Sequence, residues 1–261
     1  MIPFASEFPP VFMTSGGKHS DNMTETQKYI NTALTDNGIT VSDDKTEKLA
    51  AYLDELLRVN TYMNLTAVRD PQEAAVINIA DCCACAKYIP GNARLLDVGS
   101  GAGLPAFPFA IMRPDITVTA LDSTGKKVNF ISDTARLLGM NNLSAVCGRA
   151  EELAAKPEYR EKFTAVSARA VARLNILSEL CLPFLEKSGL FIAMKSRLAD
   201  EELDEAGKGI KILGGRVKAV DTFTLNGSDA PLSRTLILTE KVCQTPGKYP
   251  RRYKSILSAP L

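Results

Sequence analysis

The most informative segment of this chain is Arg94-Leu95-Leu96-Asp97-Val98-Gly99-Ser100-Gly101-Ala102-Gly103-Leu104-Pro105. It starts as a short apolar strand, stops at three alternating glycines and restarts as a helix at Pro105. Glycines suit such a turn because a residue without Cβ accepts positive φ and lets a ligand approach the backbone. The helix that follows turns its free N–H groups toward the same place. The stretch therefore predicts a binding site for a nucleotide-like ligand.

A second apolar segment, Thr117–Leu121, ends in Asp122, 23 residues after Gly99. An acidic residue about 20 residues beyond the glycines binds the ribose hydroxyls in dinucleotide folds. The NAD fingerprint spaces its glycines G-x-G-x-x-G, whereas Gly103 comes one position early. The tighter spacing, with Asp97 just before it, resembles motif I of the class I S-adenosylmethionine-dependent methyltransferases. We expect S-adenosylmethionine as the cofactor, with NAD as the alternative.

Strand and helix patterns alternate from Arg94 onward, which predicts an α/β fold with a parallel sheet and right-handed crossovers. Two late segments separated by the hairpin signal Asn226–Asp229 predict a terminal antiparallel strand pair. The expected strands are Leu95–Val98, Ile116–Leu121, Leu143–Cys147, Thr164–Ser167, Leu190–Lys195, Val217–Leu225 and Thr235–Val242. The expected helices are Pro105–Met112, Lys126–Leu138, Leu174–Leu185 and Asp200–Leu213, preceded by three N-terminal helices that begin near Thr24, Ser42 and Asp70.

Length and composition limit the organisation of the chain. With 261 residues, 45% hydrophobic content and a net charge of +1, we expect one α/β domain with an appendage and no global bias toward nucleic acid. We also expect a monomer. No apolar run approaches the ~18 residues of a membrane span. The predicted division is 1–22 disordered tail, 23–92 helical region, 93–242 S-adenosylmethionine-binding domain and 243–261 basic tail.

Cysteine and histidine usage narrows the chemistry. The cluster Cys82-Cys83-x-Cys85 lacks a second ligand pair at metal-site spacing, so we interpret it as buried apolar residues and expect no metal. Reduced cysteines favour a cytoplasmic protein. The one histidine, His19, lies in the expected tail, which excludes a histidine-based triad in the body of the protein. Methyl transfer to an unprotonated nitrogen is compatible with this exclusion, because the acceptor already carries a lone pair and needs no histidine base.

The C-terminal segment is basic. Five cations and two tyrosines occur after Glu240, with no acidic residue through Leu261: Lys241, Lys248, Tyr249, Arg251, Arg252, Tyr253 and Lys254. Cations mixed with aromatic residues suit phosphate neutralisation and base stacking on RNA. A solvated, frayed terminus is an equally strong interpretation.

Several segments together resemble the ribosomal RNA small-subunit methyltransferase G family, also called glucose-inhibited division protein B, whose members methylate N7 of a guanine. The segments are Asn64–Asp70, Leu96–Pro105, Leu121–Lys127, Gly148–Glu152, Ser167–Ala172, Ala193–Lys195 and Thr245–Arg251. Their order and spacing are specific to the family. The resemblance implies an enzyme that uses S-adenosylmethionine and acts on 16S ribosomal RNA in the small ribosomal subunit.

The glycine loop and the resemblance together predict the site. The cofactor-binding residues are Gly99, Gly101, Leu104, Asp122, Ala150, Glu151 and Arg169. The RNA-binding residues are Lys126, Lys127, Arg169, Lys195, Arg251 and Arg252. We expect no catalytic acid or base, because N7 already carries a free lone pair and the reaction needs alignment above all. A cation aimed at N7 would oppose the developing charge, so Arg169 and Lys195 suit phosphate or guanine O6 better.

The chain departs from the family at two places. Asn78 stands before Asp81 where the family has a His-x-x-Asp pair, and the extended basic ending is reduced to residues 255–261. Both departures lie outside the cofactor loop, so they bear on the expected RNA substrate more than on the expected cofactor. A methyltransferase of a small molecule or protein, and a non-catalytic ribosome-assembly factor, are the alternative functions. Structural alternatives for Arg149 and Arg169 are surface positions or ion pairs with Glu151 and Glu152.

Overall fold

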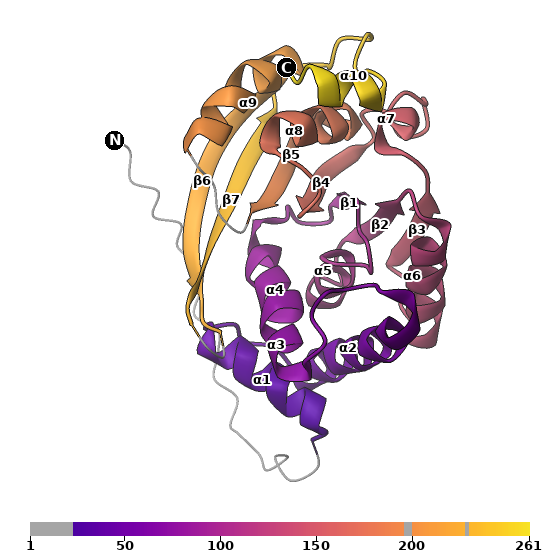
Figure 1. The fold of residues 1–261 in the computed structure, drawn as a ribbon, viewed down its shortest axis with the longest axis vertical. Helices are drawn as coiled ribbons and strands as arrows, with labels where there is room; N and C mark the ends of the chain where they lie inside the picture. The colour runs from indigo at the N-terminus through magenta and orange to yellow at the C-terminus, as the bar shows by residue number, and fades with distance from the viewer. Residues whose placement is uncertain (1–22, 196–199, 228–229) are drawn as a thin grey trace.

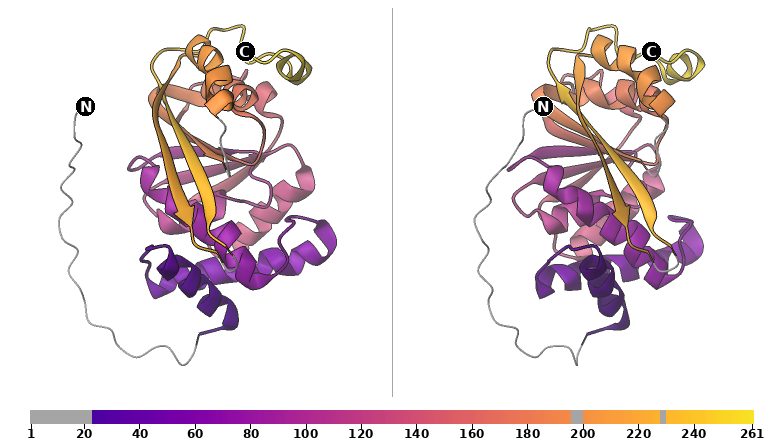
Figure 2. Two further views of the ribbon diagram at one scale, coloured as in Figure 1. Left: turned by 60° about the vertical axis from the view of Figure 1, so that its left-hand side comes forward. Right: turned by 90° about the vertical axis from the view of Figure 1, so that its left-hand side faces the viewer.

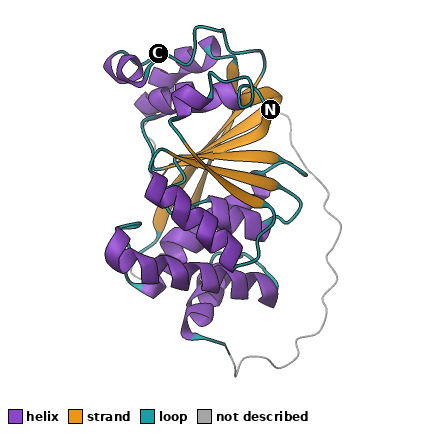
Figure 3. Cartoon of the chain, turned by 90° about the vertical axis from the view of Figure 1, so that its right-hand side faces the viewer, coloured by secondary structure: helices purple, strands orange, loops and turns teal. Residues whose placement is uncertain are grey.

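The computed structural model describes residues 23–195, 200–227 and 230–261. Its centre is a twisted seven-stranded sheet with helices on both faces (Figure 1, Figure 3). The strand order is β3-β2-β1-β4-β5-β7-β6. The strands are β1 (Arg94–Val98), β2 (Thr117–Asp122), β3 (Leu143–Cys147), β4 (Phe163–Arg169), β5 (Leu185–Lys195), β6 (Gly215–Leu225) and β7 (Leu232–Lys241).

The first five strands are parallel, and β7 pairs antiparallel with both β5 and β6. The predicted α/β fold and terminal antiparallel pair are therefore confirmed. The predicted turn between β6 and β7 lies partly outside the described residues. Parallel pairing brings the carboxyl ends of β1, β2 and β3 to one edge, where Val98 is in register with Leu121 and Asp122 with Cys147.

The helices form two layers. The layer against one face contains α4 (Asp81–Cys85), α5 (Ala106–Met112) and α6 (Gly125–Leu137), with α1 (Glu25–Asp36), α2 (Asp43–Met63) and α3 (Pro71–Ala74) beyond them. The opposite layer contains α7 (Ala150–Leu153), α8 (Leu174–Cys181), α9 (Asp200–Ile212) and α10 (Tyr253–Ser258). A π-helical turn, Ala75–Ala80, joins α3 to α4.

Local signals set the helix starts. Thr24 and Gln27 form a capping box at α1, and the carboxylate of Asp70 accepts the backbone N–H of Glu73 at 2.8 Å. Both starts were predicted. The predicted helix from Leu174 to Leu185 is too long, because α8 ends at Cys181 and Pro183 follows in a short 3₁₀ turn. Proline cannot donate to a helix and clashes with the preceding turn.

The N-terminal helices share one hydrophobic core with the sheet. Buried Ile30 and Leu53 from the helices belong to the same cluster as Leu95 of β1. The rings of Tyr52 and Phe107 stack at a centroid distance of 4.3 Å, which joins α2 to α5. The predicted domain division stays a prediction, and its segment 1–22 lies outside the described residues.

The long β6–β7 pair also reaches the N-terminal helices. Figure 2 shows the two strands running from α9 to the end of α1. At that end the backbone N–H of Asn226 donates to Asn37 at 2.7 Å, and the Asn37 amide donates back to the Asn226 carbonyl at 3.1 Å. The pair therefore forms one side wall of the molecule next to α4. Within the described ranges, no helix has the length and apolar character needed to cross a membrane.

Candidate functional site

The glycine loop connects β1 to α5. Gly99, Gly101 and Gly103 all have positive φ, at 72°, 61° and 88°. A Cβ at Gly99 would approach the Val171 side chain at 2.7 Å, so this glycine is required by packing as well as by conformation. The hydroxyl of Tyr52 donates to the Ala102 carbonyl at 2.9 Å and fixes the loop to α2.

Asp122 faces the glycine loop from the end of β2. Its carboxylate accepts the backbone N–H of Gly101 at 2.9 Å and that of Thr124 at 2.8 Å, one on each oxygen. A carboxylate oxygen has two lone pairs, so both oxygens keep capacity for a further donor. The backbone N–H groups of Gly99 and Ser100 donate to the Leu121 carbonyl and join the loop to the same strand. Asp122 is therefore well placed for two adjacent hydroxyls.

Asp97 lies beneath the loop at the end of β1 and is fully buried. The Ser167 hydroxyl donates to its carboxylate at 2.9 Å. Burial raises the pKa of Asp97 to about 6, although hydrogen bonds to the ionised form oppose the shift. Its Oδ2 and the Ser100 hydroxyl have no hydrogen-bond partner among the described residues. These buried polar atoms make the floor of the loop unusually polar.

A cavity of about 200 Å³ opens where the glycine loop meets the ends of β2 and β3, and we call it the glycine-loop pocket. Four predicted cofactor-binding residues line it, namely Gly99, Asp122, Ala150 and Glu151. Its other lining residues are Val98, Leu121, Ser123, Gly148, Arg149, Val171, Leu180 and Tyr253. Gly101 contacts this site through Asp122, whereas Leu104 is buried in the core and Arg169 lines a different cavity.

Tyr253 of α10 was not predicted as part of this pocket. The Arg149 guanidinium lies over the Tyr253 ring at 4.6 Å from its centroid and pairs with Glu151 at 2.6 Å. Arg149 thus links the C-terminal helix to the start of α7. The Arg149–Glu151 pair confirms one structural alternative for Arg149. The interleaved tyrosines of the C-terminal segment were a usable signal, although they were interpreted as an RNA-stacking feature.

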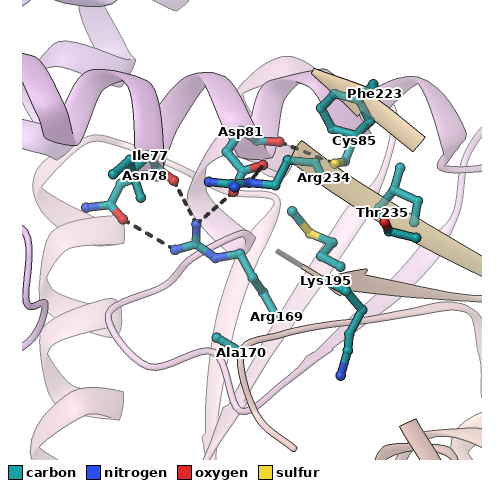
Figure 4. Close-up of a pocket in the computed structure, with 12 residues that line it drawn as sticks. Ile77, Asn78, Asp81, Cys85, Arg169, Ala170, Lys195, Phe223, Arg234 and Thr235 are labelled. Atoms are coloured by element: carbon teal, nitrogen blue, oxygen red, sulfur yellow. Dashed lines mark hydrogen bonds and ion pairs between the residues drawn. The ribbon is translucent and has the colours of Figure 1, made fainter. Parts of the chain in front are cut away.

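A second cavity, of about 310 Å³, lies beside the first, and we call it the charged pocket (Figure 4). Its lining residues are Ile77, Asn78, Asp81, Cys85, Arg169, Ala170, Met194, Lys195, Phe223, Arg234, Thr235 and Leu236. Arg234 Nε donates to Asp81 at 3.0 Å, and Arg169 Nη1 lies 3.5 Å from the other Asp81 oxygen. Arg169 therefore pairs with Asp81 and not with Glu151 or Glu152. Arg234 was missed, because no local motif marks it.

The charges in this pocket are nearly buried. Burial raises the pKa of Asp81, while the two arginines oppose that shift. Arg169 is held further by the π-helical turn, since its Nη1 donates to the Ile77 carbonyl at 2.9 Å and its Nη2 to the Asn78 side chain at 3.4 Å. Asn78 therefore helps to orient Arg169.

One short loop separates the two cavities. Arg169 and Ala170, at the end of β4, line the charged pocket, and the next residue, Val171, lines the glycine-loop pocket. Ala170 has φ 55°, a left-handed conformation that turns the chain sharply at this point. A ligand in either cavity would therefore lie next to the other cavity.

The remaining predicted RNA-binding cations lie in different environments. Lys126 and Arg252 are exposed and Lys127 is half-buried; none has an ion pair within the described ranges. The ammonium of Lys195 contacts Glu202 at 2.6 Å and the Ala172 carbonyl at 3.0 Å. Arg251 pairs with Glu179, which is fully buried.

Two interpretations of the C-terminal segment are corrected by the structure. The Lys241 side chain is fully buried and donates to the Leu182 and Leu185 carbonyls and to Thr245, so it is not available to RNA. Burial lowers the pKa of Lys241 to about 8. Tyr249 is also buried. The segment is neither a frayed end nor a free basic tail, because side chains 70 or more residues away hold it in place.

Within the part of the chain that the structure describes, no group of three or more His, Cys, Asp or Glu side chains could hold a metal ion. Cys82, Cys83 and Cys85 are buried, as predicted. Burial raises the pKa of all three thiols. These cysteines therefore act as core residues.

Comparison with known proteins identifies the family of the chain. The profile described as rRNA small subunit methyltransferase G matches residues 45–232. The protein named ribosomal RNA small subunit methyltransferase G from Lactobacillus delbrueckii subsp. bulgaricus is 45% identical over 210 residues, which cover 79% of this chain and 87% of that protein. The protein of the same name from Oceanobacillus iheyensis is 40% identical over 222 residues, covering 84% and 92%.

Solved structures share the fold at low sequence identity. The TYW2 protein of M. jannaschii, solved in complex with AdoMet, has a TM-score of 0.52 and 12% identity, covering 64% of this chain and 76% of that one. The [4+2]-cyclase SpnF has a TM-score of 0.53 and 16% identity, covering 78% and 97%. The fold is that of the class I methyltransferases, and the sequence matches identify its branch: this chain belongs to the rRNA small subunit methyltransferase G family.

Proposed function

We propose that the protein transfers a methyl group from S-adenosylmethionine to N7 of a guanine in 16S ribosomal RNA. Membership of the family supports the reaction and the RNA substrate. The observation that carries the proposal is the pair of adjoining cavities, one built on the glycine loop and one lined by arginines, separated by residues 169–171. A methyl donor and its acceptor have to be adjacent in this way.

The residues present fit the cofactor. The glycine loop offers close backbone approach, and the Asp122 carboxylate keeps lone pairs for two ribose hydroxyls. We assign Ala150 and Glu151, which line the glycine-loop pocket at the start of α7, to the adenine end. Gly101 and Leu104 would shape the loop without lining the pocket.

S-adenosylmethionine supplies an activated methyl group on a sulfonium centre. Transfer breaks the S–C bond, forms the N7–C bond and moves the positive charge to the guanine ring, so no proton has to be removed. The chain therefore has to align the acceptor and exclude water, which requires no general base. Arg169, already oriented by the Ile77 carbonyl and Asn78, suits guanine O6 beside N7.

We further propose that Lys126, Lys127 and Arg252 bind RNA phosphates, because each is at least partly exposed and lies a few residues from a residue that lines the glycine-loop pocket. Lys195 contributes less directly, since Glu202 already neutralises it. We expect the protein to act as a cytoplasmic monomer on the small ribosomal subunit. The free cysteines are compatible with a reducing compartment.

The decisive experiment is mass spectrometry of small-subunit RNA from cells with and without the protein. We expect one 7-methylguanosine to disappear without it. Purified protein with S-adenosylmethionine should then restore that nucleoside on small subunits isolated from the deficient cells. An unchanged nucleoside profile, or methylation of a different base or atom, would contradict the proposal.

A further inference from the structure

The charged pocket contains more positive charge than its own ion pairs use. Asp81 is the single carboxylate between two guanidinium groups, and its side chain is 8% exposed. Arg169 and Arg234 are 18% and 13% exposed. A net positive site that is largely closed to water favours a ligand with an electron-rich edge.

Two groups in the wall have hydrogen-bonding capacity left. Asp81 Oδ2 accepts no hydrogen bond from the described residues, since its contact with Arg169 is 3.5 Å long. Arg234 bonds through Nε and Nη1, and its Nη2 donates to none of the described residues. The pocket therefore presents an acceptor beside guanidinium donors.

This arrangement complements one edge of guanine. Guanine carries two adjacent donors, N1–H and the 2-amino group, next to the acceptor O6, so a carboxylate and a guanidinium together match it. Phe223 and Met194 line the same cavity and can contact the faces of a planar ring. Adenine reverses the donor at N1 and would leave Asp81 opposed to a lone pair.

The position of the loop orients the base. Figure 4 shows Arg169 between Asp81 and Ala170. The next residue in the chain, Val171, lines the glycine-loop pocket. On the guanine ring N7 follows O6 on the side away from N1. A base with N1 at Asp81 and O6 at Arg169 thus turns N7 toward the glycine-loop pocket.

We propose that the charged pocket binds the target guanine base, with Asp81 accepting from N1 and the 2-amino group and with Arg169 and Arg234 donating to the O6 side. This assignment rests on the proposed function and adds Asp81, Arg234 and Phe223 to its site. It requires the base to leave its stack and enter the cavity.

The test exchanges one group on each side of the contact. Small subunits are reconstituted from ligated 16S RNA that carries either guanosine or inosine at the nucleotide that mass spectrometry identifies. Inosine differs from guanosine only in lacking the 2-amino group. For the wild-type protein we expect kcat/KM to fall about 10- to 100-fold with inosine, as for loss of a charged hydrogen bond. For Asp81→Asn we expect slow reaction with both bases and a guanine-to-inosine ratio within about twofold of one.

Two controls separate recognition from folding. Asp81→Asn should bind S-adenosylhomocysteine like the wild type in calorimetry. Asp115→Asn removes another arginine-paired carboxylate, which lines neither pocket, and should keep the wild-type ratio. If Asp81→Asn fails to fold, the base assignment is tested with Phe223→Ala. Loss of stacking on Phe223 should raise KM for the small subunits about tenfold and leave S-adenosylhomocysteine binding unchanged.

The outcomes are distinct. If the wild-type ratio of kcat/KM for guanine over inosine is near one, or if Asp81→Asn keeps the wild-type ratio, then Asp81, Arg169 and Arg234 form a structural network and do not recognise the base. An unchanged KM in Phe223→Ala would equally overturn the base assignment. Failure of the wild-type protein to methylate guanine-containing particles would instead overturn the proposed function.

Discussion

At the scale of single residues, Asp122 is where we expect much of the cofactor affinity to concentrate. Its carboxylate already orders the loop through Gly101 and Thr124 and retains capacity for two ribose hydroxyls. Asp122→Ala should therefore weaken S-adenosylmethionine binding by about 2–4 kcal/mol, measured by titration calorimetry. Asp133→Ala, at an exposed aspartate on α6, is the matched control. Unchanged affinity, or a preference for NAD, would contradict the assignment.

Asp97 should make stability depend on pH. Its folded pKa is about 6 and its usual value is 3.8, so the folded state binds more protons between these values. Stability should therefore fall as pH rises from about 4 to 6, by up to about 3 kcal/mol for this group. Urea unfolding of Asp97→Asn at several pH values should lack this loss.

Asp115 provides the opposite control for Asp97. Its pKa is lowered by the Arg113 guanidinium, so its stabilising contribution is present above the usual aspartate pKa and is lost as pH falls. Asp115→Asn should thus leave the loss between pH 4 and 6 in place. If the stability of the wild type and that of Asp97→Asn change equally between pH 4 and 6, Asp97 ionises at its ordinary pKa.

At the scale of elements, α10 contributes to the glycine-loop pocket. Tyr253 lines the glycine-loop pocket beneath Arg149. Tyr253→Ala should weaken S-adenosylmethionine binding about 5- to 50-fold in calorimetry, as for loss of one stacked aromatic wall. Tyr253→Phe should retain most of the affinity, and Lys254→Ala, at the next position and exposed, should retain all of it. Equal affinities in all three variants would exclude α10 from the site.

The segment before α10 is anchored by one buried ion pair. Arg251 holds both oxygens of Glu179 through its guanidinium and adds its backbone N–H. Arg251→Ala would leave the fully buried Glu179 carboxylate uncompensated, so we expect a loss of about 3–5 kcal/mol in the free energy of unfolding by urea. Arg252→Ala, exposed at the adjacent position, should change stability little. Because of this buried pair with Glu179, we propose a structural role for Arg251 in place of RNA contact. A similar small change for both variants would show that α10 is anchored by other contacts.

At the scale of the whole molecule, RNA affinity has to come from a local surface, because the net charge is only +1. Lys126 and Lys127 at the start of α6 lie where cations oppose the helix dipole, which favours a functional role. Each phosphate that a variant no longer neutralises should reduce the salt slope of binding to small subunits by about one unit. The double variant Lys126→Ala, Lys127→Ala should therefore show a shallower slope, with S-adenosylmethionine binding unchanged.

The matched control for this surface is Lys208→Ala, at an exposed lysine on α9 that lines neither pocket. Its salt slope should equal that of the wild type. If the double variant also keeps the wild-type slope, the RNA-binding surface lies elsewhere on the molecule.

Local sequence patterns were enough to predict the framework of the fold and the residues around the glycine loop. Strand alternation, the glycine loop and the caps at Thr24 and Asp70 depend on residues within a few positions of one another, so they can be interpreted from local patterns. The position of Asp122 follows from the same logic, because parallel strands bring their carboxyl ends to one edge.

Contacts between side chains far apart in the chain could not be predicted from local patterns and became visible in the fold. Asp81 joins Arg169 and Arg234, and Glu179 joins Arg251, across separations of 72 to 153 residues. From sequence alone, such a charged residue is interpreted as solvent-exposed. Its ion-pair partner cannot be identified, because the partner depends on how the sheet places elements that are far apart in the chain. The expected basic tail is therefore an anchored segment whose Tyr253 lines the glycine-loop pocket. The fold also brings Arg234 to Asp81 and Arg169, and no local motif marks Arg234.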